Sequence, residues 1–352
     1  MAPAQGRRGI AAAAVAIAVG GAAAASSIGV SAHSTKAKLP TAPKGFSVSV
    51  FAKATAAFWN PDSVELAGNH VWVGYQNTTA KDGSDGLSST VVEYSLSGKL
   101  RATFSVLGHV DGVRVDPSTG LVWVLSNEDA NPHLTTIDPV AGTTKQYAMT
   151  SVNGGGGFDD IAFLGGKAFI SASNPTLNGA GVNVFPAIVS ATLDNATDSV
   201  DTTPVLFSSA NLNLTDPDSM YVVPSGARAG DLQLDDQADA QLVFISGPGG
   251  PAQSVSTLPI GNQMDDTILP TSPSGTLLVS DTTKTGAVYA IKSKQWDTTK
   301  YLSSAPNDSQ VIAYTGTIDT TVNPSSGFAT NKPLITGFSN PHGEAFIPKT
   351  SH

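Results

Sequence analysis

A seven-residue phrase recurs six times along the chain and constrains its fold more than any other feature. Each copy begins at a turn, carries an acidic residue or a histidine in its third place, and continues as a strand with alternating apolar residues. The six copies span Asn60–Leu66, His109–Val115, Gly157–Phe163, Asp216–Val222, Gln263–Leu269 and Asn340–Phe346. Their third-place residues are Asp62, Asp111, Asp159, Asp218, Asp265 and His342. Successive third places lie 49, 48, 59, 47 and 77 residues apart, which indicates a degenerate repeat.

Further apolar strands follow the phrases. Second strands are expected at His70–Gln76, Leu121–Ser126, Lys167–Ser171 and Thr276–Asp281. Third strands are expected at Thr90–Leu96, Leu134–Asp138, Ala187–Leu193, Gln241–Ser246 and Ala287–Lys292. A period of about 40 to 50 residues made of four short strands is typical of a propeller blade. The sequence therefore predicts an all-β propeller of four-stranded antiparallel blades, with six blades favoured and five as the alternative. A β-sandwich also has short strands at turn-rich intervals, but it gives no reason for an acidic residue at the same point of each unit.

The two ends of the repeat are expected to meet. The strand Phe46–Phe51 has no strand before it, so we expect it to complete the last blade, which begins at His342. That blade then takes its middle strands from the interval Gln295–Gly337.

The first residues resemble an export signal. Arg7 and Arg8 precede an uncharged Ala-rich run at 10–25, and small residues follow at 23–25 and 30–32 as cleavage sites. A retained membrane anchor is the alternative, but a spanning helix needs about 20 more strongly apolar residues. We expect a signal peptide at 1–32, a linker at 33–45, a propeller domain at 46–349, and a secreted or periplasmic protein.

Composition excludes several classes of function. The chain has no cysteine, which excludes disulfides, a thiol nucleophile and a thiolate metal site. Its net charge is −9, and it becomes about −11 once Arg7 and Arg8 are removed, so the basic surface of a nucleic-acid-binding protein is missing. We expect a monomer that binds a small molecule or a polymer, with no nucleic acid and no membrane contact after cleavage.

The phrases resemble those of the gluconolactonase/regucalcin superfamily of six-bladed propellers and the related NHL repeats. The family's blade opens with Pro-Asp-Gly, an apolar alternation and Asp-x-x-Gly, and the segments His109–Leu125 and Pro217–Met220 follow this grammar. The resemblance implies a divalent cation held in the channel by residues at the starts of the inner strands, and an Asp that assists lactone hydrolysis. On this resemblance Asp218 is the catalytic candidate, and Asp62 stands where the family has a metal-binding Glu.

The recurring carboxylates also carry a chemical argument of their own. Inner strands of a propeller run parallel around its axis, so the third places should form a ring at one rim, with Asp160, Asp266 and Glu344 nearby. The second strands should end near the same rim, at Asn77, Asn127, Asn174 and Asp281. Converging carboxylates either keep protons or are neutralised by a cation. Oxygen ligands favour Ca²⁺ or Mg²⁺, while His342 allows Zn²⁺ or Mn²⁺. The metal-ligand candidates are Asp62, Asp111, Asp159, Asp218, Asp265 and His342. In the alternative interpretation, each Asp bonds the backbone amides of its own turn and forms no ring.

Two classes of function stay open. One is a metal-dependent hydrolase of a small ester or lactone at the channel mouth, and the other is a non-catalytic exported propeller that binds a ligand or partner on its rim. A lyase is a third candidate, but it calls for paired histidines near the channel, and only His109 and His342 are placed for that. The fold alone does not decide between them.

Overall fold

The computed structural model describes residues 38–315 and 330–349, and from Leu39 onward they lie in one folded unit. The predicted signal peptide at 1–32 and the first part of the linker, 33–37, lie outside the described residues. Strands make up nearly all of the regular structure, and the two helices in the described part are short 3₁₀ turns at Gly226–Arg228 and Pro306–Asp308. None of the helices in this part is long and apolar enough to cross a membrane.

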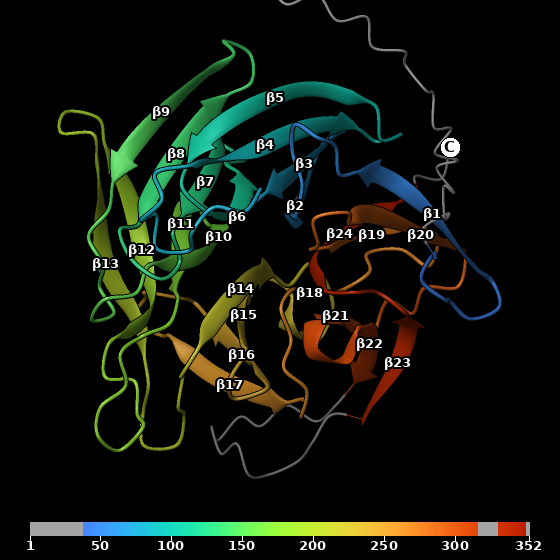
Figure 1. Ribbon diagram of the computed structural model, residues 1–352. Coiled ribbons are helices and arrows are strands. Elements are labelled where there is room, and N and C mark those ends of the chain that lie inside the picture. Colours follow the sequence, from blue (N-terminus) through green and yellow to red (C-terminus); the bar gives the residue numbers. More distant parts are fainter. Residues whose placement is uncertain (1–37, 316–329, 350–352) are drawn as a thin grey trace, which may run out of the picture. The chain divides into compact units, whose positions relative to one another are not determined.

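Consecutive strands pair into antiparallel sheets along most of the chain (Figure 1). The first such sheet contains β2 (Pro61–Ala67), β3 (His70–Tyr75), β4 (Ser88–Ser95) and β5 (Leu100–Leu107). Another contains β14 (Pro217–Val222), β15 (Leu232–Asp236), β16 (Gln241–Ser246) and β17 (Ser254–Pro259). The two phrase strands and the strands β3, β4 and β16 occur where they were expected, whereas β5, β15 and β17 were not assigned from the sequence.

Between these two sheets lies one sheet of eight strands. Its first half is β6 (Val110–Val115), β7 (Val122–Ser126), β8 (His133–Asp138) and β9 (Thr143–Ala148). Its second half is β10 (Phe158–Leu164), β11 (Lys167–Ala172), β12 (Pro186–Asp194) and β13 (Ser199–Phe207). One parallel pair, Ser199 with Ala148, joins the outer edges of the two halves.

The last two sheets exchange strands, and here the sequence-based assignment is wrong. One sheet contains β18 (Thr267–Ile268), β21 (Tyr301–Ala305), β22 (Gln310–Thr315) and β23 (Thr330–Thr336). The other contains β24 (Pro341–Pro348), β19 (Gly275–Asp281), β20 (Ala287–Ser293) and β1 (Phe46–Lys53). The strands expected to follow Asp265 in its own blade therefore pair with the sheet of His342, and the interval after Gln295 supplies the sheet of Asp265. Apolar alternation determines which face of a strand is buried, but it does not specify which of two adjacent sheets the strand joins.

The prediction for the N-terminal strand is confirmed. β1 pairs antiparallel with β20 over Phe46–Lys53, and so it forms the outer edge of the sheet that contains β24. The first and last strands of the folded unit thus share one sheet, which closes the arrangement.

The innermost strands form a ring. Neighbours contact one another in the order β2, β6, β10, β14, β18 and β24, and β24 in turn contacts β2. Six apolar clusters fill the spaces between adjacent sheets. One of them, for example, packs Trp72 and Phe104 of one sheet against Val113 and Val122 of the next. A four-stranded sheet cannot bury both of its faces alone, so this stacking forms the core of a propeller-like, all-β arrangement.

A β-bulge occurs at the same point of five inner strands. In β10, for example, Phe158 pairs with Ala172 and Ile161 with Ile170, so Asp159 and Asp160 both lie opposite Ser171. The same register shift follows the first paired residue of β2, β6 and β14 and occurs in the pairing of β24 with β19. Bulges redirect side chains and are common beside functional sites. Here the bulge falls on the third and fourth places of these five phrases.

Candidate functional site

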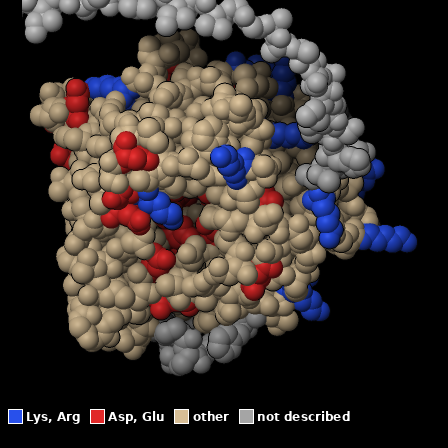
Figure 2. All heavy atoms as spheres, in the orientation of Figure 1, with Lys and Arg blue, Asp and Glu red and all other residues tan. Residues whose placement is uncertain are grey.

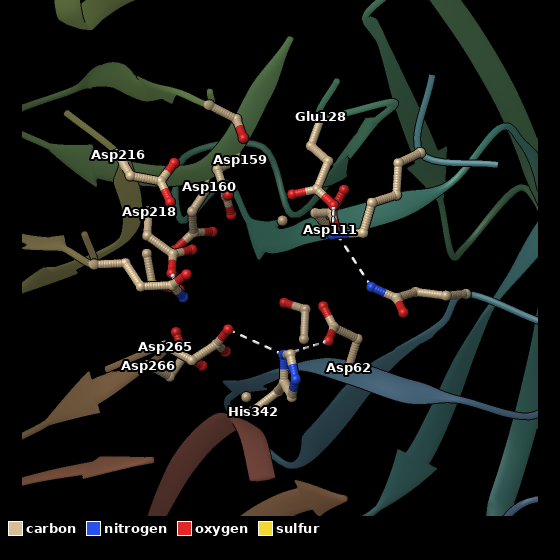
Figure 3. A pocket seen from close by; sticks show the side chains of 18 of the residues that line it. Asp62, Asp111, Glu128, Asp159, Asp160, Asp216, Asp218, Asp265, Asp266 and His342 are labelled. Atoms are coloured by element: carbon tan, nitrogen blue, oxygen red, sulfur yellow. Dashed lines mark hydrogen bonds and ion pairs between the residues drawn. The ribbon is translucent and has the colours of Figure 1, made fainter. Parts of the chain in front are cut away.

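A cavity of about 200 Å³ lies where the inner strands begin, and all six third-place residues line it. Nine of its lining side chains are acidic: Asp62, Asp111, Glu128, Asp159, Asp160, Asp216, Asp218, Asp265 and Asp266. Its basic lining residues are Lys81, Arg114 and His342. Figure 2 shows the acidic groups gathered around a hollow in the middle of one face, and Figure 3 shows their side chains converging. The structure therefore brings the predicted third-place ring together at one end of the channel.

His342 bridges two of the ring carboxylates. Its Nδ1 lies 3.1 Å from Asp62 Oδ1 and 3.0 Å from Asp265 Oδ1 (Figure 3). Burial opposes a charge on His342, but Asp265 and Asp62 together raise the pKa of the imidazole well above its ordinary value. Burial would likewise raise the pKa of Asp62, yet the hydrogen bond and the charge of His342 keep that pKa below the usual value. Burial raises the pKa of Asp265 to about 6 despite the nearby imidazolium. The triad thus places a fixed positive charge between two carboxyl groups.

Asp159 and Asp218 form a second unit on the ring. Burial, together with the charges of nearby carboxylates, raises the pKa of both groups well above the ordinary value. Because both carboxyl groups are buried and interact strongly, they favour a state in which at least one of them keeps a proton. Gln237 Nε2 donates to Asp218 Oδ2 at 2.6 Å. This pair is the part of the ring that is suited to proton transfer.

Asp111 forms a third unit with residues from other elements. Gln76 Nε2 donates to Asp111 Oδ1 at 3.1 Å, whereas Asp111 Oδ2 is buried without a hydrogen-bond partner among the described residues. Burial and the charges of Glu128 and Asp159 raise the pKa of Asp111 well above its ordinary value. Lys81 forms an ion pair with Glu128. The charge of Asp111 is thus only partly balanced, because the nearby ammonium group pairs with Glu128.

The floor of the cavity is built from the fourth-place residues. Asp160 Oδ2 accepts from the backbone N–H of Met220 at 2.8 Å and from Arg114 Nη2 at 2.5 Å. Asp266 Oδ2 accepts from the backbone N–H of Glu344 at 2.7 Å. Burial raises the pKa of Asp160 to about 7, although Arg114 opposes this shift. Arg114 also lines a second cavity of about 310 Å³ farther along the channel, next to Glu344, so its side chain separates the two spaces.

The residues expected at the ends of the second strands have mostly structural roles. Asn174 lines the cavity, but Asn77 donates to the carbonyl of Ser88, and Asn127 Oδ1 accepts from the backbone N–H of His109. Asp281 accepts from the backbone N–H groups of Ser339 and Asn340. The polar residues that reach the cavity after these strands are instead Gln76, Glu128 and Gln237. The pattern singled out none of the three, because Gln76 precedes the expected strand-end residue Asn77, Glu128 lies two residues after Ser126, and no second strand was expected before Gln237.

The donor set of this cavity fits a divalent cation. Most of its donors are carboxylate or amide oxygens, which hard cations prefer. His342 lines the cavity, and His109 lies next to Asp111. Burial and mutual repulsion raise the pKa of Asp111, Asp159 and Asp218, and a bound cation would relieve that repulsion. The buried, unpartnered Asp111 Oδ2 is an oxygen that a cation could bind. The assignment of particular ring residues as ligands stays a prediction.

Neither a protein-family model nor a curated protein matches the sequence. Solved structures similar to the chain include the periplasmic gluconolactonase of Pseudomonas aeruginosa, with 11% identity and a TM-score of 0.48 over 82% of this chain and 88% of that one. They also include a Bacteroides uniformis protein suggested to be a 6-phosphogluconolactonase, with 10% identity and a TM-score of 0.47 over 81% and 73%. The pyranose dehydrogenase PQQ domain of Coprinopsis cinerea has 11% identity and a TM-score of 0.45 over 85% and 86%. The propeller-like arrangement is seen in the chain's own sheets and inner-strand contacts, and the reaction has to be argued from the cavity.

Proposed function

We propose that this chain is an exported, six-bladed propeller that hydrolyses a small neutral ester or lactone, with a divalent cation, in the cavity at the mouth of its channel. The observation that carries the proposal is the ring of third-place residues around that cavity, with the proton-sharing pair Asp159 and Asp218 on it. Export rests on the leader at 1–32.

The blade number is supported by the ring of inner strands. Six inner strands contact one another in a closed order, and six apolar clusters lie between adjacent sheets. We count the eight-stranded sheet as two blades because the single parallel pair of Ser199 and Ala148 joins its halves only at their outer edges.

The size and charge of the cavity limit the substrate. A volume of about 200 Å³ accommodates a small molecule rather than a polymer. Nine acidic side chains line the cavity against three basic ones, so a phosphorylated or carboxylated substrate would be repelled. A neutral molecule with several hydroxyl groups, such as a small lactone, meets no such repulsion and finds acceptors on every side.

Asp218 is the group that we propose as the general base. Burial and the neighbouring carboxylates raise its pKa, which makes its ionised form a stronger base. As a carboxylate it takes the proton from a water molecule whose oxygen forms a bond to the carbonyl carbon. The acyl C–O bond then breaks, and the proton passes from Asp218 to the leaving alkoxide. The product is a hydroxy acid, or an acid and an alcohol.

Other residues that line the cavity orient the Asp218 carboxyl group or balance negative charge. Gln237 holds the Asp218 carboxyl in place through its donated hydrogen bond. The imidazolium of His342 balances part of the charge of Asp62 and Asp265. A bound divalent cation would polarise the carbonyl and lower the pKa of the attacking water.

Thermal melting tests the cation requirement. Wild-type protein is melted in chelator and in millimolar Ca²⁺, Mg²⁺ or Zn²⁺, beside the double variant Asp111→Asn with Asp218→Asn. The wild type should gain about 2.7 kcal/mol at a cation concentration of about one hundred times Kd. The double variant should lose this gain while remaining folded, because Asn keeps the shape of Asp without its charge. Identical wild-type melting in chelator and in cation would remove both the cation and the hydrolase that depends on it.

An assay of hydrolysis tests the reaction itself. Neutral γ- and δ-lactones and small esters are followed by proton release in the cation that stabilises the protein. Asp218→Asn alone should lower kcat by about a hundredfold or more, which is the usual contribution of a positioned general base. A cation-stabilised wild type with no turnover on any of these compounds would instead indicate a propeller that binds a ligand without reacting with it.

A further inference from the structure

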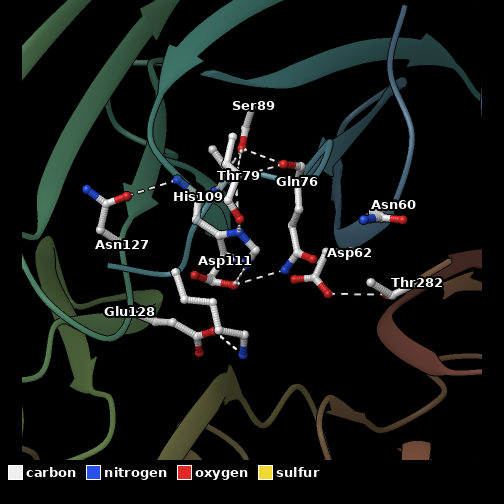
Figure 4. A network of polar contacts seen from close by, with 12 residues as sticks. Asn60, Asp62, Gln76, Thr79, Ser89, His109, Asp111, Asn127, Glu128 and Thr282 are labelled. Atoms are coloured by element: carbon white, nitrogen blue, oxygen red, sulfur yellow. Dashed lines mark hydrogen bonds and ion pairs between the residues drawn. The ribbon is translucent and has the colours of Figure 1, made fainter. Parts of the chain in front are cut away.

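Beside the cavity, Asp111 of the ring lies next to two titratable side chains that are not in third places. His109, Asp111 and Glu128 offer ligand atoms that all lie within 4.8 Å of one another. His109 is 5% exposed, Asp111 7% and Glu128 8%. Figure 4 shows their side chains facing one another across a small space. His109 occupies the first place of its phrase, and Glu128 comes from the loop after β7.

Hydrogen bonds on one side of the imidazole group fix the tautomer of His109. Its Nδ1 lies 2.9 Å from the carbonyl oxygen of Thr79 and 3.0 Å from Thr79 Oγ1. A carbonyl only accepts, and Thr79 Oγ1 already donates its own proton to the carbonyl of Gln76 at 2.7 Å. Nδ1 must therefore carry a proton, so the neutral imidazole has its lone pair on Nε2. A histidine held by a backbone carbonyl in this way is the usual arrangement behind a metal-binding nitrogen.

The lone pair of His109 has no partner in the part of the chain that the structure describes. Nε2 is buried without a hydrogen bond, and so is Asp111 Oδ2. The nearest carboxylate atom in the ion-pair geometry is Asp111 Oδ1, at 3.8 Å from Nε2, which is too long for a hydrogen bond. Two ligands about 2.1 Å from one tetrahedral ion lie about 3.4 Å apart, so a small adjustment brings these atoms to a common ion. Buried polar atoms of this kind normally have partners, and their absence indicates a ligand.

We propose that His109 Nε2, Asp111 and Glu128 form a binding site for a borderline divalent metal, Zn²⁺ or Mn²⁺, at the wall of the cavity. One nitrogen and two carboxylates suit these ions, whereas Ca²⁺ prefers a set made only of oxygen atoms. Three protein ligands leave a position open toward the cavity, as in catalytic rather than structural zinc sites. The site does not depend on the proposed hydrolysis, since it would exist equally in a propeller that only binds ligands.

Lys81 occupies part of this site in the structure. Its ammonium group forms an ion pair with Glu128, and its side chain is 58% exposed. Such a side chain can turn into solvent at small cost when a metal takes its place. The metal and the ammonium group therefore compete for one carboxylate, which gives the site a signature that a purely structural cluster lacks.

Calorimetric titration of the full chain with Zn²⁺ near neutral pH tests the site. The wild type should bind one equivalent, and His109→Gln and Glu128→Gln should each weaken binding by about tenfold or more. His70→Gln is the matched control, because His70 also contacts a carboxylate, Glu93, but lies away from the cavity. Its Zn²⁺ affinity should equal that of the wild type.

Two further measurements keep the test decisive if His109→Gln folds poorly. Lys81→Met removes the competing ammonium group and should tighten Zn²⁺ binding several-fold, whereas a structural ion pair would yield no such gain. Co²⁺ in place of Zn²⁺ should give the visible absorption of a histidine-ligated site in the wild type, and this should be lost in Glu128→Gln. Absence of Zn²⁺ binding, or equal affinity in His109→Gln and His70→Gln, would overturn the site. Neither outcome depends on whether the protein hydrolyses lactones.

Discussion

The third and fourth places of each phrase are adjacent in sequence, yet they serve different parts of the molecule. Third-place carboxylates face the cavity, and in the described part of the chain their hydrogen bonds go to side chains such as Gln76, Gln237 and His342. Fourth-place residues point toward the next sheet. Ser63 accepts from the N–H of Val113, just as Asp160 and Asp266 accept from the corresponding N–H groups of the following phrases. Successive side chains of a regular strand point to opposite faces, but the β-bulge lets the third- and fourth-place side chains lie on the same, channel-facing side.

The third place therefore presents groups to a ligand, whereas the fourth place links neighbouring sheets. The hydroxyl or carboxylate of Ser63, Asp160 and Asp266 links every second pair of neighbouring sheets by one hydrogen bond to a fifth-place backbone amide. In two of the remaining junctions the fourth place is glycine. A Cβ on Gly112 would lie 2.5 Å from the carbonyl oxygen of Asp159, and one on Gly343 would lie 2.3 Å from that of Asp62. An Asp in such a phrase is therefore structural in one place and available to a ligand in the other.

The largest expected effect comes from a fourth-place carboxylate. Asp160→Ala removes the acceptor of the Met220 amide and leaves Arg114 without its 2.5 Å partner. The Arg114 side chain is only 13% exposed, so water would replace that partner poorly. Breaking a buried pair by removing one partner costs about 3–5 kcal/mol. The matched third-place variant, Asp159→Ala, removes a carboxylate that its neighbours repel, and it should change stability by less than about 1 kcal/mol. Urea unfolding measures both, and equal losses would contradict the separation of roles.

The dependence of stability on pH should carry contributions from carboxyl groups in both places. The pKa of Asp265 is raised to about 6 and that of Asp160 to about 7, so the folded chain holds these protons more tightly than the unfolded chain, whose aspartates titrate near 4. The stabilisation is complete below about pH 4 and is lost as the pH rises through about 6 and then about 7. Asp62, whose pKa is lowered, acts in the opposite sense.

In chelator, the loss from Asp265 alone should be about 2 kcal/mol, after allowance for partial exposure. A saturating divalent cation should remove the contribution of Asp265 and leave that of Asp160 in place. Urea midpoints measured between pH 4 and pH 8, with and without cation, would show this. Stability that rises over this range in chelator would contradict the assignment.

Replacing a fourth-place glycine at a junction between sheets should cause a smaller loss of stability. Gly112→Ala forces a methyl group against the backbone of the next inner strand, and overpacking of this kind costs about 1–3 kcal/mol. Gly179→Ala is the control, because the added methyl group meets no atom within 4 Å and the backbone there is not left-handed. The control should unfold within about 0.5 kcal/mol of the wild type. Equal stability of the two variants in thermal melting would show that the inner strands are less closely apposed.

The sequence predicted the third-place ring because its chemistry recurs at one point of a repeat. It could not predict the fourth-place links, because their partners are amides about 50 to 80 residues away that belong to the next phrase. The exchange of β19 and β20 was also missed, because consecutive strands usually pair and the alternation in Thr276–Asp281 suits either sheet. Glu128 lies in a loop outside every phrase. The tautomer of His109 depends on Thr79, 30 residues earlier, so its availability as a ligand can be recognised only in three dimensions.

The smallest expected effect compares two serines in the same place of two phrases. Ser63 Oγ accepts from the Val113 amide at 3.1 Å, and Arg114 Nη1 lies 3.2 Å from it. Ser63→Ala should cost about 1 kcal/mol, since it leaves one buried amide without an acceptor but no charge without a partner. Ser219 occupies the fourth place of a later phrase, and no link of its side chain to the next sheet occurs among the described residues. Ser219→Ala should therefore stay within about 0.5 kcal/mol of the wild type in urea unfolding. Should the two variants lose the same stability, the hydrogen bond of Ser63 would contribute nothing as a link between sheets. The fourth place would then matter only where it carries a charge, as at Asp160 and Asp266.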